Sequence, residues 1–520
     1  MADYAYRGNL SAKVIPVNPD LFGRSIVVKD RDQNYAPNVT SRTDVDKDIG
    51  MPQVMYIANY LPTEYGYSAI GLYGSKETCP GTPYTAFPVR NSTSVITLVH
   101  TTEGYLYRLK KSTEGSEVPQ FVYIGQYVGN ISYALAAGST YIYVAGVGCY
   151  QYNFNDDTLS SVTLSGLAPE AILGITSTGG YMLAWSSDAI AWSSLVNPTD
   201  FVPSLDTGAG GGGVEGAKGA ITVCVSNSYG VYIFTESNCV SAQLSNNARF
   251  PFNFKEIVGS SGVESAQQVS FEGNQNSAYA FTSAGFQQIS HNGAKNLWTE
   301  LHENGLNCPI WNENTVISSG ATSGVDGKIV DAKLVNVGSK YICVSIKART
   351  NNYYDQCWIY DTALDKWGRI VKDHYDVFET DDFKIGFITT TNRYIHVDSP
   401  FSTSPYPIEP DLPYIALGRY QYSRARLTML QQIDLENCYP VDIRDVNGDL
   451  LEFQAYPKVY DMASLDGKSG VFEEMYRDAF SSVAYARYLT RKTALNHTIL
   501  VKGFANLNSI VLLFTQGGNR

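Results

Sequence analysis

Three stretches of this 520-residue chain have the residue types of ligand-binding loops. Gly208, Gly210 and Gly213 match the Gly-x-Gly-x-x-Gly pattern that cradles nucleotide phosphates, but no strand precedes them and no helix follows. Asp30-x-Asp32-x-Asn34 and the turn Asp445–Asp449 share the start of a calcium loop, yet neither has Glu at its twelfth position. We interpret the glycine run as a flexible loop and Asp445–Asp449 as a hairpin turn, so we expect no cofactor.

Catalytic and metal-binding patterns are also absent from the sequence. The six histidines are dispersed and none has the HxxxH or HExxH spacing of a zinc site. No GxSxG nucleophile elbow occurs. The acidic run Glu379–Asp382 could hold a carboxylate pair of the glycosidase kind, but such a run is more typical of a solvated loop. The sequence therefore predicts no catalytic residue, no metal site and no enzyme.

Basic residues form the remaining chemical feature and lie near the C-terminus. They could contact a phosphate backbone or an acidic partner, or they could be charges on strand edges that block unwanted pairing. The two groups are Arg419, Arg424 and Arg426, and Arg487, Arg491 and Lys492.

Composition limits the partners and the compartment. The formal net charge of −12 argues against a protein whose main task is to clamp phosphates, although it allows a surface past which DNA slides. The N-terminus lacks a signal peptide, and no apolar run reaches the roughly 18 residues of a membrane span. The eight cysteines form no CxxC pair and are expected to be reduced, mostly buried thiols.

The elements that position these residues are β-strands in a repeating pattern. The chain has 38 Tyr, 45 Gly and only 17% charged residues, which favours β structure. Similar strands begin at Thr97, Tyr141, Tyr181, Val231, Ala278, Tyr341 and Tyr394, at spacings of 44, 40, 50, 47, 63 and 53 residues. This period is typical of propeller blades, about 40 to 50 residues each. We predict an all-β chain with a propeller of six or seven blades, the alternative being a β-sandwich.

The composition divides the chain into four parts. Residues 1–90 are predicted to be an arm that packs on a platform domain, and residues 91–398 the propeller. Residues 399–415 are rich in proline and read as a linker. Residues 416–520 are predicted to be the β-rich platform, with one possible amphipathic helix at Phe472–Val483. Within the propeller, four tryptophans are expected to fill the wedges between blades: Trp185, Trp192, Trp358 and Trp367.

Three phrases of the propeller and the end of the chain resemble a known family. The phrases are IAWSSLVNPTDF (Ile190–Phe201), AITVCVSNSYGVYIFTESNCV (Ala220–Val240) and FNFKEIVGSSGV (Phe252–Val263). They are similar to tail nozzle proteins of short-tailed bacteriophages (podoviruses). The ending, from Arg487 to Gly518, is similar to the last strands of the tail tubular B-like, packaged-DNA stabilisation proteins.

The resemblance implies a structural protein of the virion tail, made in the host cytoplasm. It would form a homohexameric ring below the portal and adaptor, continue the channel for double-stranded DNA and help retain the genome. It would also guide DNA ejection and anchor tail fibres, spikes or a needle. Candidate gate loops are Gly208–Gly213 and the insertion between Val344 and Cys357, with Asn351 and Tyr353. Two other functions stay open: a carbohydrate-binding or carbohydrate-active propeller, and a kelch-like adaptor that binds a protein.

Overall fold

A computed structural model provides the fold. It describes residues 10–16, 53–91, 95–110, 120–227, 230–245, 247, 251–272, 277–298, 329–348, 352–400, 408, 412–420, 427–436, 438, 440–445, 449–464, 472–478, 485–494 and 496–516. In this part of the chain almost all regular structure is β, and the helical segments are two single-turn 3-10 helices, η2 (Pro169–Ala171) and η3 (Ala266–Gln268).

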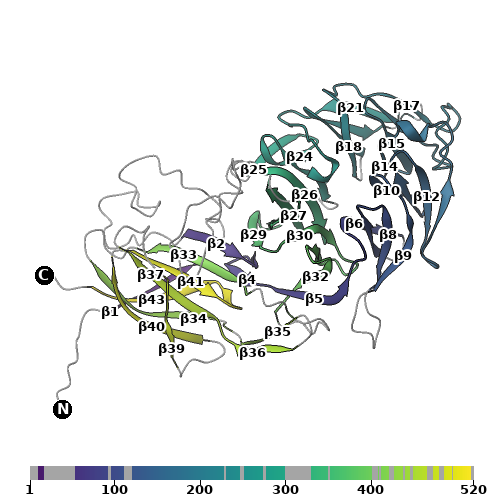
Figure 1. The fold of residues 1–520 in the computed structure, drawn as a ribbon. Helices are drawn as coiled ribbons and strands as arrows, with labels where there is room; N and C mark the ends of the chain where they lie inside the picture. The colour runs from purple at the N-terminus through teal and green to yellow at the C-terminus, as the bar shows by residue number, and fades with distance from the viewer. Residues whose placement is uncertain are drawn as a thin grey trace, which may run out of the picture.

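Seven four-stranded antiparallel arrays, counted over the described ranges, form the blades of a propeller (Figure 1). Blades one to three are β6 (Pro83–Arg90), β7 (Val95–Thr101), β8 (Tyr105–Lys110) and β9 (Gln120–Gln126); β10 (Ile131–Ala136), β11 (Ser139–Val144), β12 (Gly148–Asn153) and β13 (Thr158–Val162); β14 (Gly174–Thr178), β15 (Tyr181–Trp185), β16 (Ala189–Trp192) and β17 (Gly210–Gly213).

Blades four to six continue the same order of strands. They are β18 (Ile221–Asn227), β19 (Gly230–Thr235), β20 (Cys239–Leu244) and β21 (Phe252–Glu256); β22 (Val269–Glu272), β23 (Ser277–Thr282), β24 (Gly285–Ser290) and β25 (Gly293–Trp298); β26 (Ile329–Val337), β27 (Tyr341–Ala348), β28 (Gln356–Asp361) and β29 (Lys366–Ile370). The first strand of each blade lies toward the centre of the ring, where β14 contacts both β10 and β18 (Figure 1).

The seventh blade combines two distant parts of the chain. Its first three strands are β30 (His374–Glu379), β31 (Ile385–Thr389) and β32 (Arg393–Asp398), and its outermost strand is β5 (Gly71–Thr78). Leu72 and Tyr73 of β5 pair with Val397 and His396 of β32. Because β5 runs on into β6 of blade one, this pairing closes the ring.

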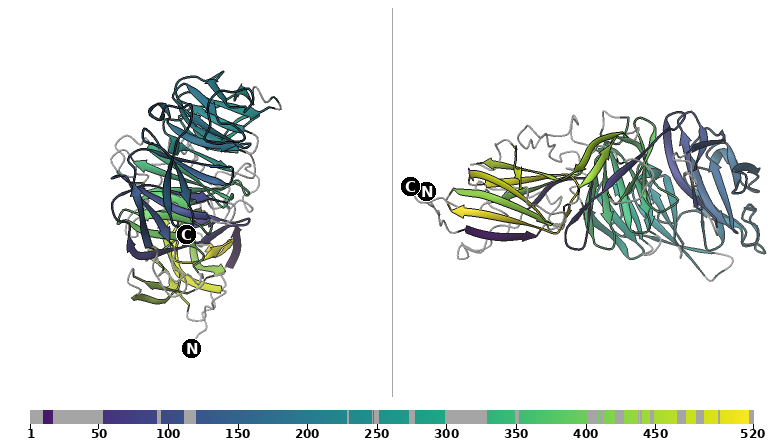
Figure 2. Two further views of the ribbon diagram at one scale, coloured as in Figure 1. Left: turned by 90° about the vertical axis from the view of Figure 1, so that its right-hand side faces the viewer. Right: turned by 90° about the horizontal axis from the view of Figure 1, so that it is seen from below.

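The platform is a sandwich of two five-stranded sheets (Figures 1 and 2). One sheet has the order β1 (Leu10–Pro16), β43 (Ser509–Gln516), β34 (Thr428–Glu436), β40 (Tyr485–Ala494) and β39 (Tyr476–Arg477); the other has β2 (Gln53–Ala58), β33 (Tyr414–Tyr420), β41 (Asn496–Lys502), β37 (Lys458–Ser464) and β38 (Glu473–Glu474). Buried side chains of both sheets, such as Leu430, Ile433, Ile499 and Val501, share one core. A separate two-stranded hairpin, β35 (Val441–Arg444) and β36 (Leu450–Ala455), projects from it.

Three short strands join the propeller to the platform. β3 (Tyr60–Pro62) pairs with Arg369 of blade six, β4 (Tyr67–Ala69) pairs with β3, and β42 (Asn506–Leu507) of the platform pairs with β4. The turn between β3 and β4 lies so close to β42 that a Cβ on Gly66 would be 2.0 Å from the Leu507 carbonyl oxygen. Continuous hydrogen bonding therefore runs from blade six into the platform.

The strands divide the predicted arm between both parts of the molecule. β1 and β2 lie in the two platform sheets, whereas β5 and β6 of the same 1–90 segment belong to blades seven and one. Of the predicted linker, residues 399, 400, 408 and 412–415 are described; Ile408 forms a bridge with Tyr73, and β33 begins at Tyr414.

The amphipathic helix predicted at Phe472–Val483 is wrong over its described part. Residues 472–478 are extended, and β38 and β39 each lengthen one sandwich sheet at its edge. Phe472 and Met475 are buried in the platform while Tyr476 faces solvent. Pairing with β37 and β40 satisfies the backbone groups here, so it replaces the helical hydrogen bonds that the apolar spacing suggested.

Candidate interaction surfaces and the closed ring

Asp376 on the inner strand of blade seven is the centre of a buried contact between three blades. Lys333 of β26 forms an ion pair with it, and the backbone N–H of Ala86 in β6 donates to it. The Lys333 ammonium also donates to the hydroxyl of Thr85, at 3.1 Å. Burial raises the pKa of Asp376, and the Lys333 ammonium opposes that rise. One carboxylate thus connects blades six, seven and one beside the seam of the ring.

Glu379 repeats this arrangement at the end of the same strand. It accepts from the backbone N–H of Gly338 in the turn after β26, at 2.9 Å, and it forms an ion pair with Arg90 of β6. The Arg90 guanidinium also lies over the ring of Phe383, 5.3 Å from its centre. The acidic run that suggested a catalytic pair therefore contributes its first carboxylate to blade packing.

Polar and aromatic side chains surround Asp376. Tyr354 donates to the Gln267 side chain at 3.2 Å, and burial raises the pKa of both Tyr354 and Asp331. A carbohydrate-active propeller would need carboxylates and aromatic rings that converge in this way. However, Asp376 is fully buried and ion-paired, so it cannot reach a ligand as it stands.

His374, on the same strand, is a buried neutral imidazole. Its Nδ1 lies 2.6 Å from the Lys372 carbonyl oxygen and must carry the proton, so Nε2 accepts from the Ser345 hydroxyl at 2.7 Å. Burial lowers the pKa of His374 to about 4, from 6.5. A charged imidazole here would be buried without solvation or a counter-charge, because the Ser345 hydroxyl offers it only a neutral acceptor.

We expect His374 to make the propeller sensitive to acid. Its contribution to the free energy of unfolding is complete above pH 6.5 and is lost as pH falls toward 4, because the unfolded chain binds a proton that the folded chain excludes. The loss approaches about 3 kcal/mol. Denaturant unfolding of the wild type and of His374→Gln between pH 4 and 7 would measure it. Parallel pH profiles of the two proteins would contradict this expectation.

Two of the four tryptophans predicted to fill the wedges between blades contact an aromatic ring of a neighbouring blade. The Trp367 ring packs edge-on against Phe286 of blade five, with centroids 5.2 Å apart, and Trp192 of blade three packs in the same way on Phe252 of blade four, at 5.5 Å. Trp185 belongs to a buried cluster shared by blades three and four. Trp358 is fully buried beneath the Arg369 guanidinium, 5.0 Å from it.

The glycine run of the proposed gate lies at the rim of the propeller. Residues Gly210–Gly213 form β17, the outermost strand of blade three, and pair with β16. Gly208 precedes it with a positive φ of 76°, and its carbonyl accepts from the Trp192 indole at 3.0 Å. The predicted flexible loop is therefore wrong from Gly210 onward, because pairing with β16 orders the glycines. Of the other gate candidates, Tyr353 is half-buried and Asn351 lies outside the described residues.

The described basic residues near the C-terminus do not form one exposed cluster. Arg487 forms an ion pair with Asp434 and Lys492 one with Glu473, whereas Arg491 is exposed on β40. Arg419 lies in β33, and the structure describes nothing of its side chain; Arg424 and Arg426 lie outside the described residues. Asp30–Asn34, the first calcium-like stretch, also lies outside them.

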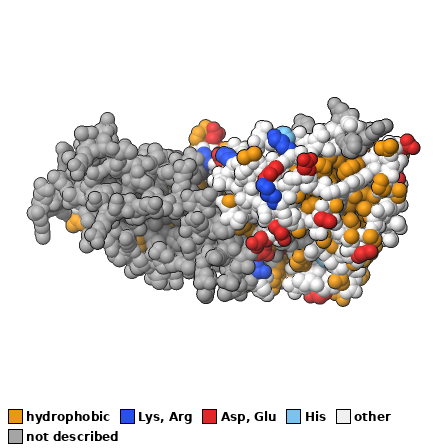
Figure 3. Space-filling view, turned by 90° about the horizontal axis from the view of Figure 1, so that it is seen from above, with side chains coloured by type: hydrophobic (Ala, Val, Ile, Leu, Met, Phe, Trp, Pro, Cys, Tyr) orange, Lys and Arg blue, Asp and Glu red, His pale blue; other side chains and the backbone are white. Residues whose placement is uncertain are grey.

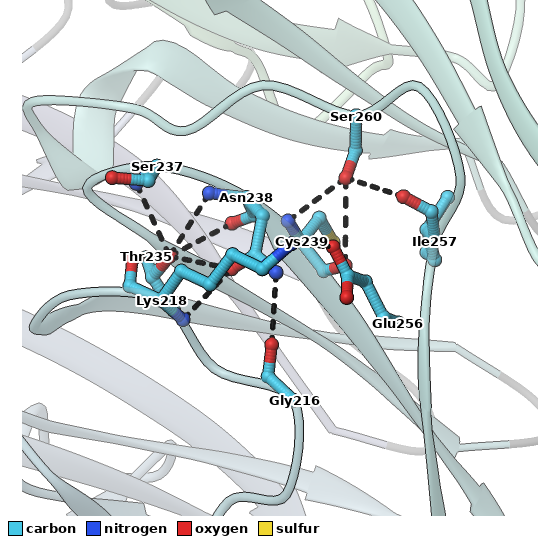
Figure 4. A network of polar contacts seen from close by, with 9 residues as sticks. All are labelled: Gly216, Lys218, Thr235, Ser237, Asn238, Cys239, Glu256, Ile257 and Ser260. Atoms are coloured by element: carbon cyan, nitrogen blue, oxygen red, sulfur yellow. Dashed lines mark hydrogen bonds and ion pairs between the residues drawn. The ribbon is translucent and has the colours of Figure 1, made fainter.

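In blade four, a dense network of polar side chains forms hydrogen bonds with backbone groups. Figure 4 shows Thr235 at the end of β19 within hydrogen-bond distance of Lys218, Ser237 and Asn238, and the Asn238 amide donates to the Gly216 carbonyl at 2.9 Å. Ser260 contacts both Cys239 and Ile257 in the same way. These bonds hold the β19–β20 turn against the segments that enter and leave the blade. We assign the network a structural role.

Blades two and three lie in a stretch of sequence without positive charge, which the sequence analysis missed; of its acids, Asp157 is neutralised by Arg108 and Lys110 of blade one. Residues 112–217 contain no Lys, Arg or His but nine acidic residues: Glu114, Glu117, Asp156, Asp157, Glu170, Asp188, Asp200, Asp206 and Glu215. This stretch alone therefore contributes −9 to the net charge of −12. Counting charge by segment rather than over the whole chain would have found it.

The insertion between β16 and β17, which lies within this acidic stretch, presents apolar side chains to solvent. Val196 and Leu205 are 88% and 71% exposed, and Leu195 and Val202 are also exposed. Buried Phe201 anchors the insertion, whose turns are held by side-chain bonds such as Ser194 to the Val196 amide. In Figure 3, seen from the side of β17 and β21, hydrophobic side chains gather over this part of the propeller. Ordered apolar side chains in solvent are typical of a protein interface.

Other chemical sites have no support among the described residues. No group of three His, Cys, Asp or Glu side chains there is placed to hold a metal ion. No helix within the described ranges is long and apolar enough to cross a bilayer. Seven cysteines are described, all of them buried and none of them in a disulfide, and burial raises the pKa of Cys79 and Cys149 to about 12. Such thiols are poor nucleophiles.

The fold and its surfaces define a seven-bladed β-propeller protein with an attached β-sandwich. No protein-family model and no curated protein matches the sequence. Among solved structures, the WD40 β-propeller domain of Doa1 is similar with a TM-score of 0.41 and 9% identity, covering 65% of this chain and 99% of that chain. The β-propeller domain of Cps50 (Swd1) from Myceliophteria thermophila gives 0.40 and 9%, covering 63% and 99%. These similarities concern the fold alone.

Proposed function

We propose that this protein is a structural component of a short-tailed phage tail, a nozzle subunit that assembles into a hexameric ring below the portal and adaptor. The observation that carries the proposal is the phrase IAWSSLVNPTDF, whose resemblance to nozzle proteins falls on β16 and the exposed insertion of blade three. In this proposal the insertion is a contact for a fibre, spike or needle protein. It would bind an apolar surface with a basic rim, because blades two and three bear only negative charge.

The joint between the two parts of the molecule suits a ring that bears load. Blade six and the platform share one hydrogen-bonded sheet through β3, β4 and β42, so a force on the propeller is transmitted to the platform through paired backbone. A negatively charged channel wall would repel DNA phosphates and let the genome slide without sequence recognition. The formal net charge of −12 is the basis for such a wall in this proposal.

Electron microscopy of the purified full chain tests the proposal. Negative-stain images and native mass, measured with and without a portal-type ring, should show six-fold rings that bind the portal end-on. A protein that stays monomeric and ignores such rings would overturn it. In that case a protein-binding adaptor would be the better function, because the rigid apolar insertion of blade three fits a protein partner.

A further inference from the structure

Three large apolar side chains of the β35–β36 hairpin, all on β36, lie in solvent, whereas Val441, Ile443 and Ala455 are buried. The two strands pair with each other and, within the described ranges, with no other sheet. Residues Leu450, Leu451, Glu452 and Phe453 of β36 all face solvent, and Phe453 is 65% exposed. Val441 packs into the main core, so the hairpin is anchored at its base while the large side chains of β36 stay in solvent. Three neighbouring large apolar side chains on such a hairpin are therefore expected to be covered by a partner.

The hairpin is also acidic, which limits the chemistry of that partner. It carries Asp442, Asp445, Asp449 and Glu452 against the single cation Arg444, which lies 3.8 Å from Asp442. A complementary surface would present cations around an apolar patch, because like charges across an interface cost several kcal/mol.

The platform itself carries a surface of this kind on the five-stranded sheet that contains β40. Along β40, Leu489, Arg491 and Thr493 are exposed and Arg487 is half-buried, while Ala486 and Tyr488 are buried. Leu489 lies opposite Tyr476 of β39, which is 68% exposed, so the two form an apolar pair. β40 carries three cations and no acid. We call Tyr476, Leu489 and Arg491 the β40 patch.

We propose that the β35–β36 hairpin of one copy docks on the β40 patch of the next copy. Leu451 and Phe453 would cover Tyr476 and Leu489, and Glu452 would face Arg491. Two different surfaces meet in this contact, so each copy offers one to each neighbour and the assembly can close into a ring. The inference rests on the proposed ring and names the surfaces that build it. The contact also gives Arg491, the exposed cation of the predicted basic residues, an acidic protein partner instead of DNA.

Charge exchange in the full-length protein tests the contact. Glu452→Lys and Arg491→Glu should each weaken self-association by about tenfold or more, because each places like charges together. The exchanged pair in one chain, E452K/R491E, should restore it. An equimolar mixture of the two single variants should also recover rings, since an even-membered ring can alternate the two chains. Self-association is measured by sedimentation velocity over a concentration series, and rings are counted by negative stain.

Matched controls separate this contact from general charge effects. Glu170→Lys and Lys255→Glu make the same charge changes at exposed positions of the propeller and should leave self-association unchanged. Circular dichroism checks that each variant is folded. If both single variants still form rings as the wild type does, the contact is overturned but the proposed function stays intact. Failure of the double variant and of the mixture to recover would do the same. A wild type that never associates overturns the proposed ring itself.

Discussion

Asp376→Asn is expected to lower the free energy of unfolding of the propeller by about 3–5 kcal/mol. The substitution keeps the shape of the side chain but leaves the Lys333 ammonium buried without a counter-charge, and Lys333 is only 5% exposed. It also weakens the contact with the Ala86 amide of blade one. Denaturant unfolding followed by tryptophan fluorescence should show the loss in the transition of the propeller.

The double variant Lys333→Met/Asp376→Leu is the matched control. It removes both charges and keeps similar volumes, so it should cost much less than Asp376→Asn, since no buried charge remains. Glu379→Gln should also cost less, because its partner Arg90 is 44% exposed and can be solvated. An Asp376→Asn protein as stable as the wild type would show that the three-blade contact contributes nothing to closure.

Weakening β5 is expected to open the propeller at one seam. Leu72 is buried among residues of blades six and seven, and Leu72→Ala should cost about 2–5 kcal/mol. Tyr73→Ala removes a ring stacked on His396 and a hydrogen bond of 2.7 Å to the Ser399 carbonyl. The pair of substitutions should make blades one and seven the first sites of protease cleavage and of hydrogen exchange.

Leu159→Ala in β13 is the control for this experiment. It also lies in the outermost strand of a blade, but it is only half-buried, and its strand continues directly from β12. We expect a smaller loss of stability and no selective cleavage at the seam between blades one and seven. Equal cleavage patterns in the Leu72→Ala/Tyr73→Ala and Leu159→Ala proteins would show that β5 has no special part in closing the ring.

Local alternation allowed the blades to be predicted. Six of the seven predicted strand starts fall in the second strands of blades one to six, as Tyr141 does in β11 and Tyr181 in β15. The seventh, Tyr394, lies in the third strand, since the second strand of that blade is β31. Central strands are buried on both faces and their hairpins are short, so their pattern can be read from neighbouring residues alone.

Outer strands and surfaces were less predictable. Gly210–Gly213 has no apolar pattern, and it becomes strand β17 only because β16 offers a free edge. The apolar spacing of Phe472, Met475 and Tyr476 fits a helix and two short edge strands equally well, and the neighbouring sheet edges decide. Of the basic residues, the sequence could not tell that Arg487 and Lys492 have acidic neighbours while Arg491 is exposed.

The sequence by itself determined the all-β class, the repeat and its length, because these depend on contacts between residues close in the chain. Only the tertiary structure decided that the ring has seven blades and that β5 closes it. It also decided that β1 and β2 complete the platform sheets, and that Asp376 meets Lys333 and Ala86. Apart from the Lys333 contact, which spans 43 residues, these pairings join segments hundreds of residues apart. Which partner each strand edge or buried charge meets depends on the assembled fold, and nothing in its neighbouring residues specifies it.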